Sequence, residues 1–205
     1  NVIMEVSSHA LEQNRVGGCD FRGAIFTNLT QDHLDYHITM SNYFEAKAIL
    51  FKGLKEGTFA VINKDDKYGD DFISVVPDGV KVITYGVKKQ ADVMAKHIDF
   101  SIHGATCIFS YNGKDYNINL KLNGMFSIYN SLAAFSAAMG LGIQPETALK
   151  ALEETSSVAG RFEIVNKEPL VIVDYAHTPD GLENVLKAAR ELTPKTSKLI
   201  CLFLE

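Results

Sequence analysis

The sequence predicts an α/β protein with a parallel-rich sheet, a small antiparallel sheet and the start of a second α/β domain. Residues 1–86 contain short apolar runs that end in polar residues, and between two of these runs lies a segment whose apolar residues recur at helical spacing. Residues 92–122 instead alternate apolar with polar side chains, and a further strand–helix pattern follows residue 160. These changes of period predict two kinds of strand pairing and two domains.

Four apolar runs in the first part of the chain are predicted to be strands. They cover residues 1–6, 23–28, 58–63 and 81–86. Near-continuous apolar runs are typical of strands buried on both faces of a parallel sheet. Apolar residues at helical spacing predict a helix over residues 42–52, capped by Ser41 or Asn42. Ligand-binding loops are expected at the carboxyl ends of such strands.

The segment from residue 92 to residue 122 is predicted to form the antiparallel sheet. Asn112-Gly113 separates two alternating runs. This pair favours the positive φ angles of a type I′ turn and therefore predicts a hairpin. Helical spacing returns over residues 127–139, and Pro145 opens another helix that reaches about residue 154.

Small and polar residues at 155–160 predict a boundary between two domains, 1–160 and 161–205. The chain opens within an apolar run without an initiating Met and stops within another, so we expect it to be an internal piece of a longer protein. Leu204-Glu205 is a pair that a cloning site often leaves.

The region after the boundary is predicted to begin with a βαβ unit. An apolar run over residues 170–175 predicts a strand, and Thr178-Pro179 can cap and open a helix. The apolar stripe of this helix contains Leu182, Val185, Leu186 and Ala189. A further strand is predicted over residues 199–203.

Composition excludes several classes of protein. The formal net charge of -5 leaves no basic excess to neutralise nucleic-acid phosphates. No apolar run is long enough to span a bilayer, and no signal-peptide pattern opens the chain. Cys19, Cys107 and Cys201 are widely spaced in no metal-ligand pattern, which predicts reduced, buried thiols of a cytosolic protein.

The first candidate site is Glu5-Val6-Ser7-Ser8-His9, at the end of the first predicted strand. A buried carboxylate is costly unless it is paired or bound to a metal, and a strand-end acid is well placed to hold Mg²⁺ beside a phosphate. The alternative is a capping network of Ser and Glu at a strand-to-helix turn, which the residue types alone favour.

The second candidate site is Asp32-His33-Leu34-Asp35-Tyr36-His37. Two acids and two histidines this close can bind a metal, so a metal-dependent hydrolase using Asp32, His33, Asp35 and His37 is one alternative function. The spacing is not that of the HExxH zinc hydrolases. A helix-capping Asp beside a solvated His explains the residue types equally well.

Lys47 is the third candidate, because it lies within a strongly apolar helical segment. Burial lowers the pKa of a lysine and supplies the neutral amine that reacts with CO₂ or a carbonyl. The alternative is a lysine whose stem packs on apolar surface while its charge stays in water.

The fourth candidate combines Gly160-Arg161-Phe162-Glu163 with Asp174-Tyr175-Ala176-His177-Thr178-Pro179. An acid at the carboxyl end of a strand can bind ribose hydroxyls, and the following helix N-terminus favours anions. The alternative is an interdomain salt bridge from Arg161 together with ordinary helix capping by Thr178.

In this order, and together with Tyr43-Phe44-Glu45-Ala46-Lys47, these clusters resemble the Mur ligase family of ATP-dependent amide ligases. The resemblance runs over essentially the whole chain. It implies a central ATPase domain, which has a parallel-rich sheet with helices and a small antiparallel sheet. It also implies that a Rossmann-like C-terminal domain starts after it.

The resemblance implies a catalytic metal site. Glu5 matches a glutamate that binds Mg²⁺, and His33 matches a histidine on a second Mg²⁺. Lys47 matches a carbamylated lysine whose new carboxylate helps to hold that second ion.

The resemblance also implies two sets of substrate contacts. The residues that match contacts to a muramoyl-dipeptide are Ser7, Gln13 and Arg15. The residues that match the nucleotide site are Asn130 near the adenine, Arg161 at the domain hinge, Asp174 at the ribose, and His177 in the same motif.

Two features depart from the family pattern. Ser127 stands where many members have a further Asn, so the resemblance does not extend to that adenine contact. No GxxxxGK[ST] phosphate loop occurs in these 205 residues. The resemblance implies that this loop lies upstream of Glu5, so we expect the piece by itself to be inactive.

The implied activity is the addition of meso-diaminopimelate or L-lysine to UDP-N-acetylmuramoyl-L-alanyl-D-glutamate through an acyl phosphate, with ATP and Mg²⁺. This is a step of cytoplasmic peptidoglycan synthesis, and the enzyme is expected to be a monomer without nucleic-acid or membrane partners. A folylpolyglutamate-synthetase-like ligase is a rival with the same chemistry. The Ser-Ser-His-Ala-Leu run at residues 7–11 argues against it.

Overall fold

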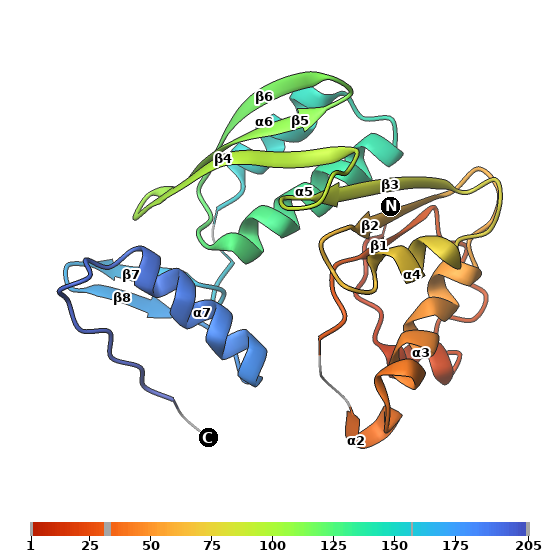
Figure 1. The fold of residues 1–205 in the computed structure, drawn as a ribbon, viewed down its shortest axis with the longest axis horizontal. Coiled ribbons are helices and arrows are strands. Elements are labelled where there is room, and N and C mark those ends of the chain that lie inside the picture. The colour runs from red at the N-terminus through yellow and green to blue at the C-terminus, as the bar shows by residue number, and fades with distance from the viewer. Residues whose placement is uncertain (1, 31–33, 157, 204–205) are drawn as a thin grey trace.

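The computed structural model describes residues 2–30, 34–156 and 158–203, with the backbone alone for Leu34 and Asp35. Six strands form one mixed sheet in the order β1-β2-β3-β4-β5-β6, and β7 and β8 form a separate pair (Figure 1). The predicted α/β class is therefore confirmed. Among the described residues, no helix is both long and apolar enough to cross a membrane.

The parallel half of the sheet contains β1 (Gly23–Phe26), β2 (Phe59–Asn63) and β3 (Lys81–Gly86). Every residue of the central strand β2 is buried. Phe59 and Val61 enter one hydrophobic core, whereas Ala60 and Ile62 enter the other. Successive side chains of a strand point to opposite faces, so helices must cover both sides of this sheet.

Four short or medium helices accompany the parallel strands: α1 (Ser8–Glu12), α2 (Leu34–His37), α3 (Met40–Lys52) and α4 (Gly69–Ser74). Helix α3 begins two residues earlier than predicted because Thr39 is its cap. The Thr39 side chain accepts a hydrogen bond from the backbone N–H of Asn42 at 3.1 Å. Phe51 of α3 and Phe72 of α4 belong to the same core as β1 and β2.

The antiparallel strands are β4 (Val93–Ser101), β5 (Gly104–Tyr111) and β6 (Lys114–Leu120). Asn112 and Gly113 have φ angles of 49° and 72°, which confirms the predicted turn. Strand β4 runs parallel to β3, so the antiparallel strands extend the main sheet. Helices α5 (Met125–Gly140) and α6 (Pro145–Glu154) pack in the core that these strands share with β2 and β3.

The region after residue 160 contains β7 (Glu163–Lys167), β8 (Leu170–Val173) and α7 (Pro179–Glu191). Figure 1 shows these elements to one side of the main sheet, beyond one end of α5. Their core includes Phe162, Ala188 and Ala189, with Phe126 of α5 packed against it. The rings of Phe126 and Phe162 lie 5.6 Å apart, so one aromatic contact joins the two regions.

Two predicted strands are wrong. The described residues of 1–6 and the residues 199–203 form no strand. Val2 and Ile3 are 87% and 97% exposed, and Ile200 and Leu202 are 86% and 84% exposed. An apolar run becomes a strand only where a neighbouring strand pairs with its backbone N–H and C=O groups. The second region is therefore an antiparallel hairpin followed by a helix, without the predicted βαβ unit among its described residues.

The prediction of three buried thiols is confirmed for Cys107 and wrong for Cys19 and Cys201. Cys107 is buried, and burial raises the pKa of its thiol to about 11. Cys19 and Cys201 are exposed, because Cys19 lies in the irregular chain before β1 and Cys201 in the segment after α7. Residue type alone indicated burial, whereas the lack of strand pairing around these two residues decided their exposure.

Candidate active site

The carboxyl ends of β1 and β2 are held together by the polar turn that follows β2. The side-chain amide of Asn63 donates to the carbonyl oxygen of Thr27 at 2.7 Å. One carboxylate oxygen of Asp66 accepts the backbone N–H of Leu29 at 3.1 Å. The turn therefore fixes the start of the loop that leads toward His33.

Asp65 in the same turn binds the end of β3 and the first half of α5. Its carboxylate accepts the backbone N–H groups of Val87, Lys88 and Lys89 at 2.6, 3.0 and 2.7 Å. It also accepts the hydroxyl of Tyr129 at 2.8 Å. A single side chain thus joins three elements at the edge of the sheet where ligands bind in α/β folds.

The protonation states of this pair follow from their surroundings. Burial of Asp65 disfavours its charge, but the three backbone N–H groups and the Tyr129 hydroxyl outweigh burial and hold the pKa of Asp65 below its usual range. Burial, and then the bond to Asp65, raise the pKa of Tyr129. None of the candidate sites predicted from the sequence includes Asp65. The available signal was Asn and Asp directly after a buried strand, where such side chains bind nearby backbone groups.

The four residues predicted around α1 lie in short loops and caps. Glu5 is exposed in the segment before α1. The Ser7 side chain caps α1 by accepting the backbone N–H of Ala10 at 3.2 Å. Gln13 is the C-terminal cap, and Arg15 is exposed just beyond it. Ser7 therefore has the capping role that was its alternative interpretation, and its hydroxyl faces the start of the helix.

Lys47 lies on α3 and is half-buried. Its ammonium nitrogen is 5.2 Å from the centroid of the Tyr43 ring, one turn earlier on the same helix. The predicted helix is confirmed, whereas the side chain is less buried than the apolar sequence around it indicated. Its amine lies beside the aromatic face of Tyr43.

The cluster predicted at residues 32–37 is only partly described. Asp32 and His33, and the side chain of Asp35, lie outside the described residues. His37 is buried, and its Nε2 lies 2.8 Å from the hydroxyl oxygen of Ser8. In the described part of the chain, no three His, Cys, Asp or Glu side chains are grouped to hold a metal ion. His37 is therefore buried and hydrogen-bonded to α1.

The two residues considered for adenine contact differ in exposure. Asn130 is exposed on α5, next to the Tyr129 that Asp65 holds. Ser127 is buried, and its hydroxyl donates to the carbonyl oxygen of Asn123 at 2.7 Å. Ser127 thus satisfies the local backbone at the start of α5, whereas the Asn130 side chain is open to solvent.

Arg161 and Asp174 are brought together, as the fourth candidate site required. The backbone on both sides of Arg161 is left-handed, with φ angles of 69° at Gly160 and 45° at Phe162. Asp174 accepts the backbone N–H groups of Phe162 and Ala176, each at 2.7 Å. A non-glycine residue at positive φ is costly, so the Asp174 bond to Phe162 stabilises this unusual turn.

The aromatic ring of Tyr175 contacts both Arg161 and His177. The Arg161 guanidinium carbon is 5.6 Å from the Tyr175 ring centroid. The ring centroids of Tyr175 and exposed His177 lie 5.3 Å apart, and Nδ1 of His177 lies 3.1 Å from the Tyr175 carbonyl oxygen. The hinge therefore presents a cation, an aromatic face and an imidazole in one short segment.

A cavity of about 170 Å³ joins this hinge to the start of α5. Its lining includes Ser127, Arg161 and Asn123. The side-chain oxygen of Asn123 is buried and has no hydrogen-bond partner among the described residues. The structure thus places a predicted hinge residue beside the α5 segment that also carries Asn130.

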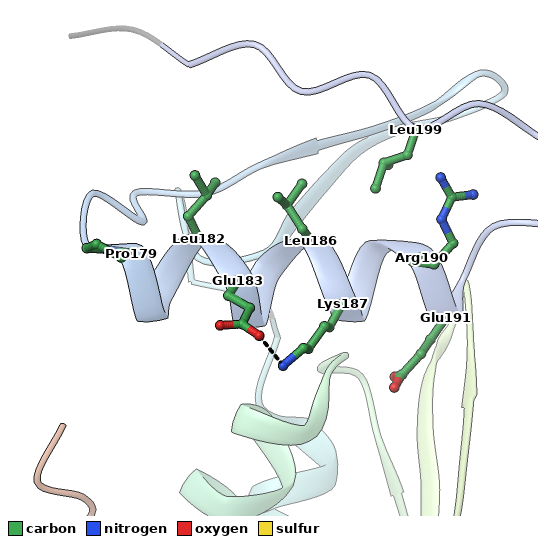
Figure 2. Close-up of a pocket in the computed structure, with 8 residues that line it drawn as sticks. All are labelled: Pro179, Leu182, Glu183, Leu186, Lys187, Arg190, Glu191 and Leu199. Atoms are coloured by element: carbon green, nitrogen blue, oxygen red, sulfur yellow. Dashed lines mark ion pairs between the residues drawn. The ribbon is translucent and has the colours of Figure 1, made fainter. Parts of the chain in front are cut away.

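A larger cavity of about 700 Å³ lies along the outer face of α7 (Figure 2). Leu182 and Leu186 point to the side where Leu199 lies, and Glu183 pairs with Lys187 at 2.5 Å. None of the predicted site residues lines this groove. Its leucine-rich lining offers packing surface, so we do not assign chemistry to it.

Comparison with known proteins gives two family matches. The Mur ligase middle domain matches residues 1–138, and the Mur ligase glutamate ligase domain matches residues 160–204. The UDP-N-acetylmuramoyl-L-alanyl-D-glutamate--2,6-diaminopimelate ligase of Syntrophomonas wolfei is 46% identical over 98% of this chain and 41% of its own length. The ligase of the same name from Bacillus velezensis is 48% identical over 93% of this chain and 40% of its own length. The chain thus spans about two fifths of these relatives.

Solved structures agree with these matches. A structure of UDP-N-acetylmuramoyl-L-alanyl-D-glutamate--2,6-diaminopimelate ligase has a TM-score of 0.79 and 36% identity, and covers 93% of this chain and 40% of that one. Thermotoga maritima MurF ligase in complex with ADP has a TM-score of 0.72 at 20% identity, over 89% of this chain and 42% of that one, which indicates the fold alone. With the middle-domain match covering most of its residues, the chain belongs to the Mur ligase family.

Proposed function

We propose that the longer protein containing this chain adds 2,6-diaminopimelate to UDP-N-acetylmuramoyl-L-alanyl-D-glutamate, with ATP, in cytoplasmic peptidoglycan synthesis. The observation that carries the proposal is the 46% and 48% identity to two ligases of that name over nearly the whole chain. We also propose that the central domain ends near residue 160, between the two family matches.

The chemistry explains why such an enzyme needs ATP. A carboxylate does not react with an amine at neutral pH, so the terminal phosphoryl group of ATP is first transferred to a carboxylate oxygen. The resulting acyl phosphate is attacked by the amine of the incoming amino acid. A tetrahedral intermediate forms and collapses, which breaks the bond to phosphate and leaves the amide. Catalysis of both steps depends on positioning and on charge stabilisation.

The residues of this chain supply contacts to both substrates in the proposal. Asn130, Arg161, Asp174 and His177 bind the nucleotide. The bond from the backbone N–H of Phe162 to Asp174, and the contact of Arg161 with the Tyr175 ring, support that role at the hinge. Ser7, Gln13 and Arg15 contact the muramoyl-dipeptide, and all three lie at the ends of α1 or just beyond it.

We assign Glu5, His33 and a carbamylated Lys47 as Mg²⁺ ligands. Mg²⁺ prefers oxygen ligands and neutralises crowded phosphate and carboxylate charges when bound. The exposed Glu5 carboxylate fits this preference, and Lys47 fits it once its neutral amine has attacked CO₂ and lost a proton. Carbamylation replaces a repelling cation by a carboxylate. His33 lies outside the described residues.

The proposal is tested on the full-length protein by following ADP release with UDP-N-acetylmuramoyl-L-alanyl-D-glutamate, ATP and diaminopimelate. We expect turnover that requires all three substrates, with L-lysine as the competing amino acid. Preferred turnover of a folate and glutamate would instead identify the rival ligase class. Hydrolysis that requires Zn²⁺ and no ATP would identify a hydrolase.

Lys47→Arg in the full-length protein is expected to lose nearly all turnover, because a guanidinium keeps its charge and forms no carbamate. Lys47→Ala should be equally inactive, and a small added carboxylic acid should restore part of its activity. Arg has a stem similar to that of Lys, and Ala is a strong helix former at a half-buried position of α3, so circular dichroism should show both variants folded. Near-normal turnover of Lys47→Arg would exclude the carbamate.

A further inference from the structure

We propose that His37 is a positioning residue that holds α1, with its substrate-side residues, against α3, which carries Lys47. This inference rests on the proposed function, because it assigns a role in the binding of the muramoyl-dipeptide. It adds a residue that lies away from the reacting atoms and acts through Ser8 and Tyr43.

The imidazole of His37 binds α1 from inside the protein. His37 is 3% exposed and Ser8 is 1% exposed, so their 2.8 Å contact is shielded from water. On the same helix, Glu12 places a carboxylate oxygen 3.6 Å from Nδ1 of His37. A buried polar pair of this kind fixes geometry, because either partner alone would be left without its hydrogen bond. Ser8 directly follows Ser7, which is proposed to contact the substrate.

The other side of the ring binds α3. The His37 and Tyr43 rings are stacked, with centroids 4.9 Å apart and an interplanar angle of 17°. Lys47 lies over the same Tyr43 ring. One imidazole therefore connects the proposed substrate-side helix to the helix that carries the proposed carbamate.

The backbone directly after His37 is in an unfavourable conformation. Ile38 has a φ angle of 67°, which is rare for a β-branched residue, and its side chain is 78% exposed. The His37 carbonyl accepts the Asn42 side-chain amide at 2.9 Å and the Thr39 N–H at 2.7 Å. Burial of Ile38 does not compensate this strain. An unfavourable conformation that its surroundings maintain indicates that the geometry it produces is needed.

A purely structural histidine would give the same static contacts, so the test must separate stability from substrate binding. In the full-length ligase we compare Ser8→Ala, His37→Phe and His37→Gln. Phe keeps the ring stack but removes the bond to Ser8. Gln places an amide nitrogen near the position of Nε2 and can keep that bond. Ser136→Ala is the matched control, because it removes another fully buried Ser hydroxyl, on α5.

We expect Ser8→Ala and His37→Phe to raise the KM for UDP-N-acetylmuramoyl-L-alanyl-D-glutamate about tenfold, since small misplacements of binding groups have large effects. The KM for ATP should stay within about twofold, because the nucleotide residues lie on other elements. The double variant Ser8→Ala/His37→Phe should have the same KM for this substrate as His37→Phe alone, because the two side chains form one contact. His37→Gln should recover part of the loss, and Ser136→Ala should behave as the wild type.

Lower melting temperatures with an unchanged KM for the dipeptide substrate would overturn the positioning role. Equal increases in both KM values would overturn it too, since they indicate a general loss of order. Ser8→Ala removes one hydroxyl and tests the contact even if His37→Phe does not fold. A wild-type protein without ligase activity would disprove the proposed function itself. An active wild type whose variants have unchanged KM values would disprove only the inference about His37.

Discussion

Asp65 illustrates how one residue organises the candidate site. Its carboxylate accepts four hydrogen bonds that come from the end of β3 and from Tyr129 of α5. Bonds from several donors to an ionised carboxylate stabilise the charged form and order the loops that supply them. Asn130 follows Tyr129 directly, so the position of this proposed nucleotide contact depends on Asp65.

Asp65→Asn is expected to destabilise this chain by about 1–3 kcal/mol at neutral pH, because an amide cannot accept all of these donors. The folded pKa of Asp65 lies below its unfolded value, which is about 3.9. Its contribution is therefore present above that unfolded value and is lost as pH falls through the folded pKa. Urea unfolding should show that the difference in free energy of unfolding between wild type and Asp65→Asn narrows below about pH 4.

The control for this prediction is Asp71→Asn, which changes an exposed carboxylate in the first turn of α4. The difference in free energy of unfolding between wild type and Asp71→Asn should be small at every pH. A constant difference for Asp65→Asn across the acid range would show that its ionisation does not stabilise the fold.

At the scale of elements, helices α3 and α7 have the same kind of cap but different support. Thr39 and Thr178 each accept a backbone N–H from three residues later, at 3.1 and 3.2 Å. Helix α3 also buries Tyr43, Ala46, Ala48 and Phe51. Helix α7 buries only Ala188 and Ala189 among its residues, and its outer face borders the groove in Figure 2. The stability of α7 therefore depends more on local interactions than that of α3 does.

Thr178→Ala is expected to cost about 1 kcal/mol, as the loss of a helix cap usually does. Because packing adds little to α7, hydrogen exchange of its amides should speed up while exchange in α5 stays unchanged. Thr39→Ala removes the same interaction from α3, whose amides should remain protected by tertiary packing. Equal loss of protection in both helices would contradict this difference in support.

At the scale of the whole molecule, residues 155–160 connect two regions that share little core. The described residues of this segment are exposed, apart from half-buried Gly160. The contact between Phe126 and Phe162 is the aromatic link across the boundary. Small interfaces of this kind permit one region to move relative to the other.

Limited digestion with a non-specific protease is expected to cut first between residues 154 and 166, as mass spectrometry of the early fragments would show. Exposed segments without regular hydrogen bonding are cleaved most readily. The hairpin turn at Asn112-Gly113 is an internal control, because its flanking strands pair up to Tyr111 and Lys114. A first cut in that turn, or within the parallel strands, would place the boundary elsewhere.

The sequence by itself determined the features that depend on neighbouring residues. The φ angles at Asn112-Gly113 and the start of α7 at Thr178-Pro179 follow from the conformational preferences of those residues. The order of the motifs was enough to identify the family, because each motif is a short run. Asp65 was not among the candidate residues, since its partners lie 22 to 64 positions away.

Only the tertiary structure decided which apolar runs became strands and which polar residues met. The described residues of 1–6, and 199–203, have the composition of strands but no strand beside them to complete their hydrogen bonds. The contact of His37 with Ser8 joins residues 29 positions apart. Local preference limits the conformations of a residue, whereas burial and pairing depend on groups that only the folded chain brings together.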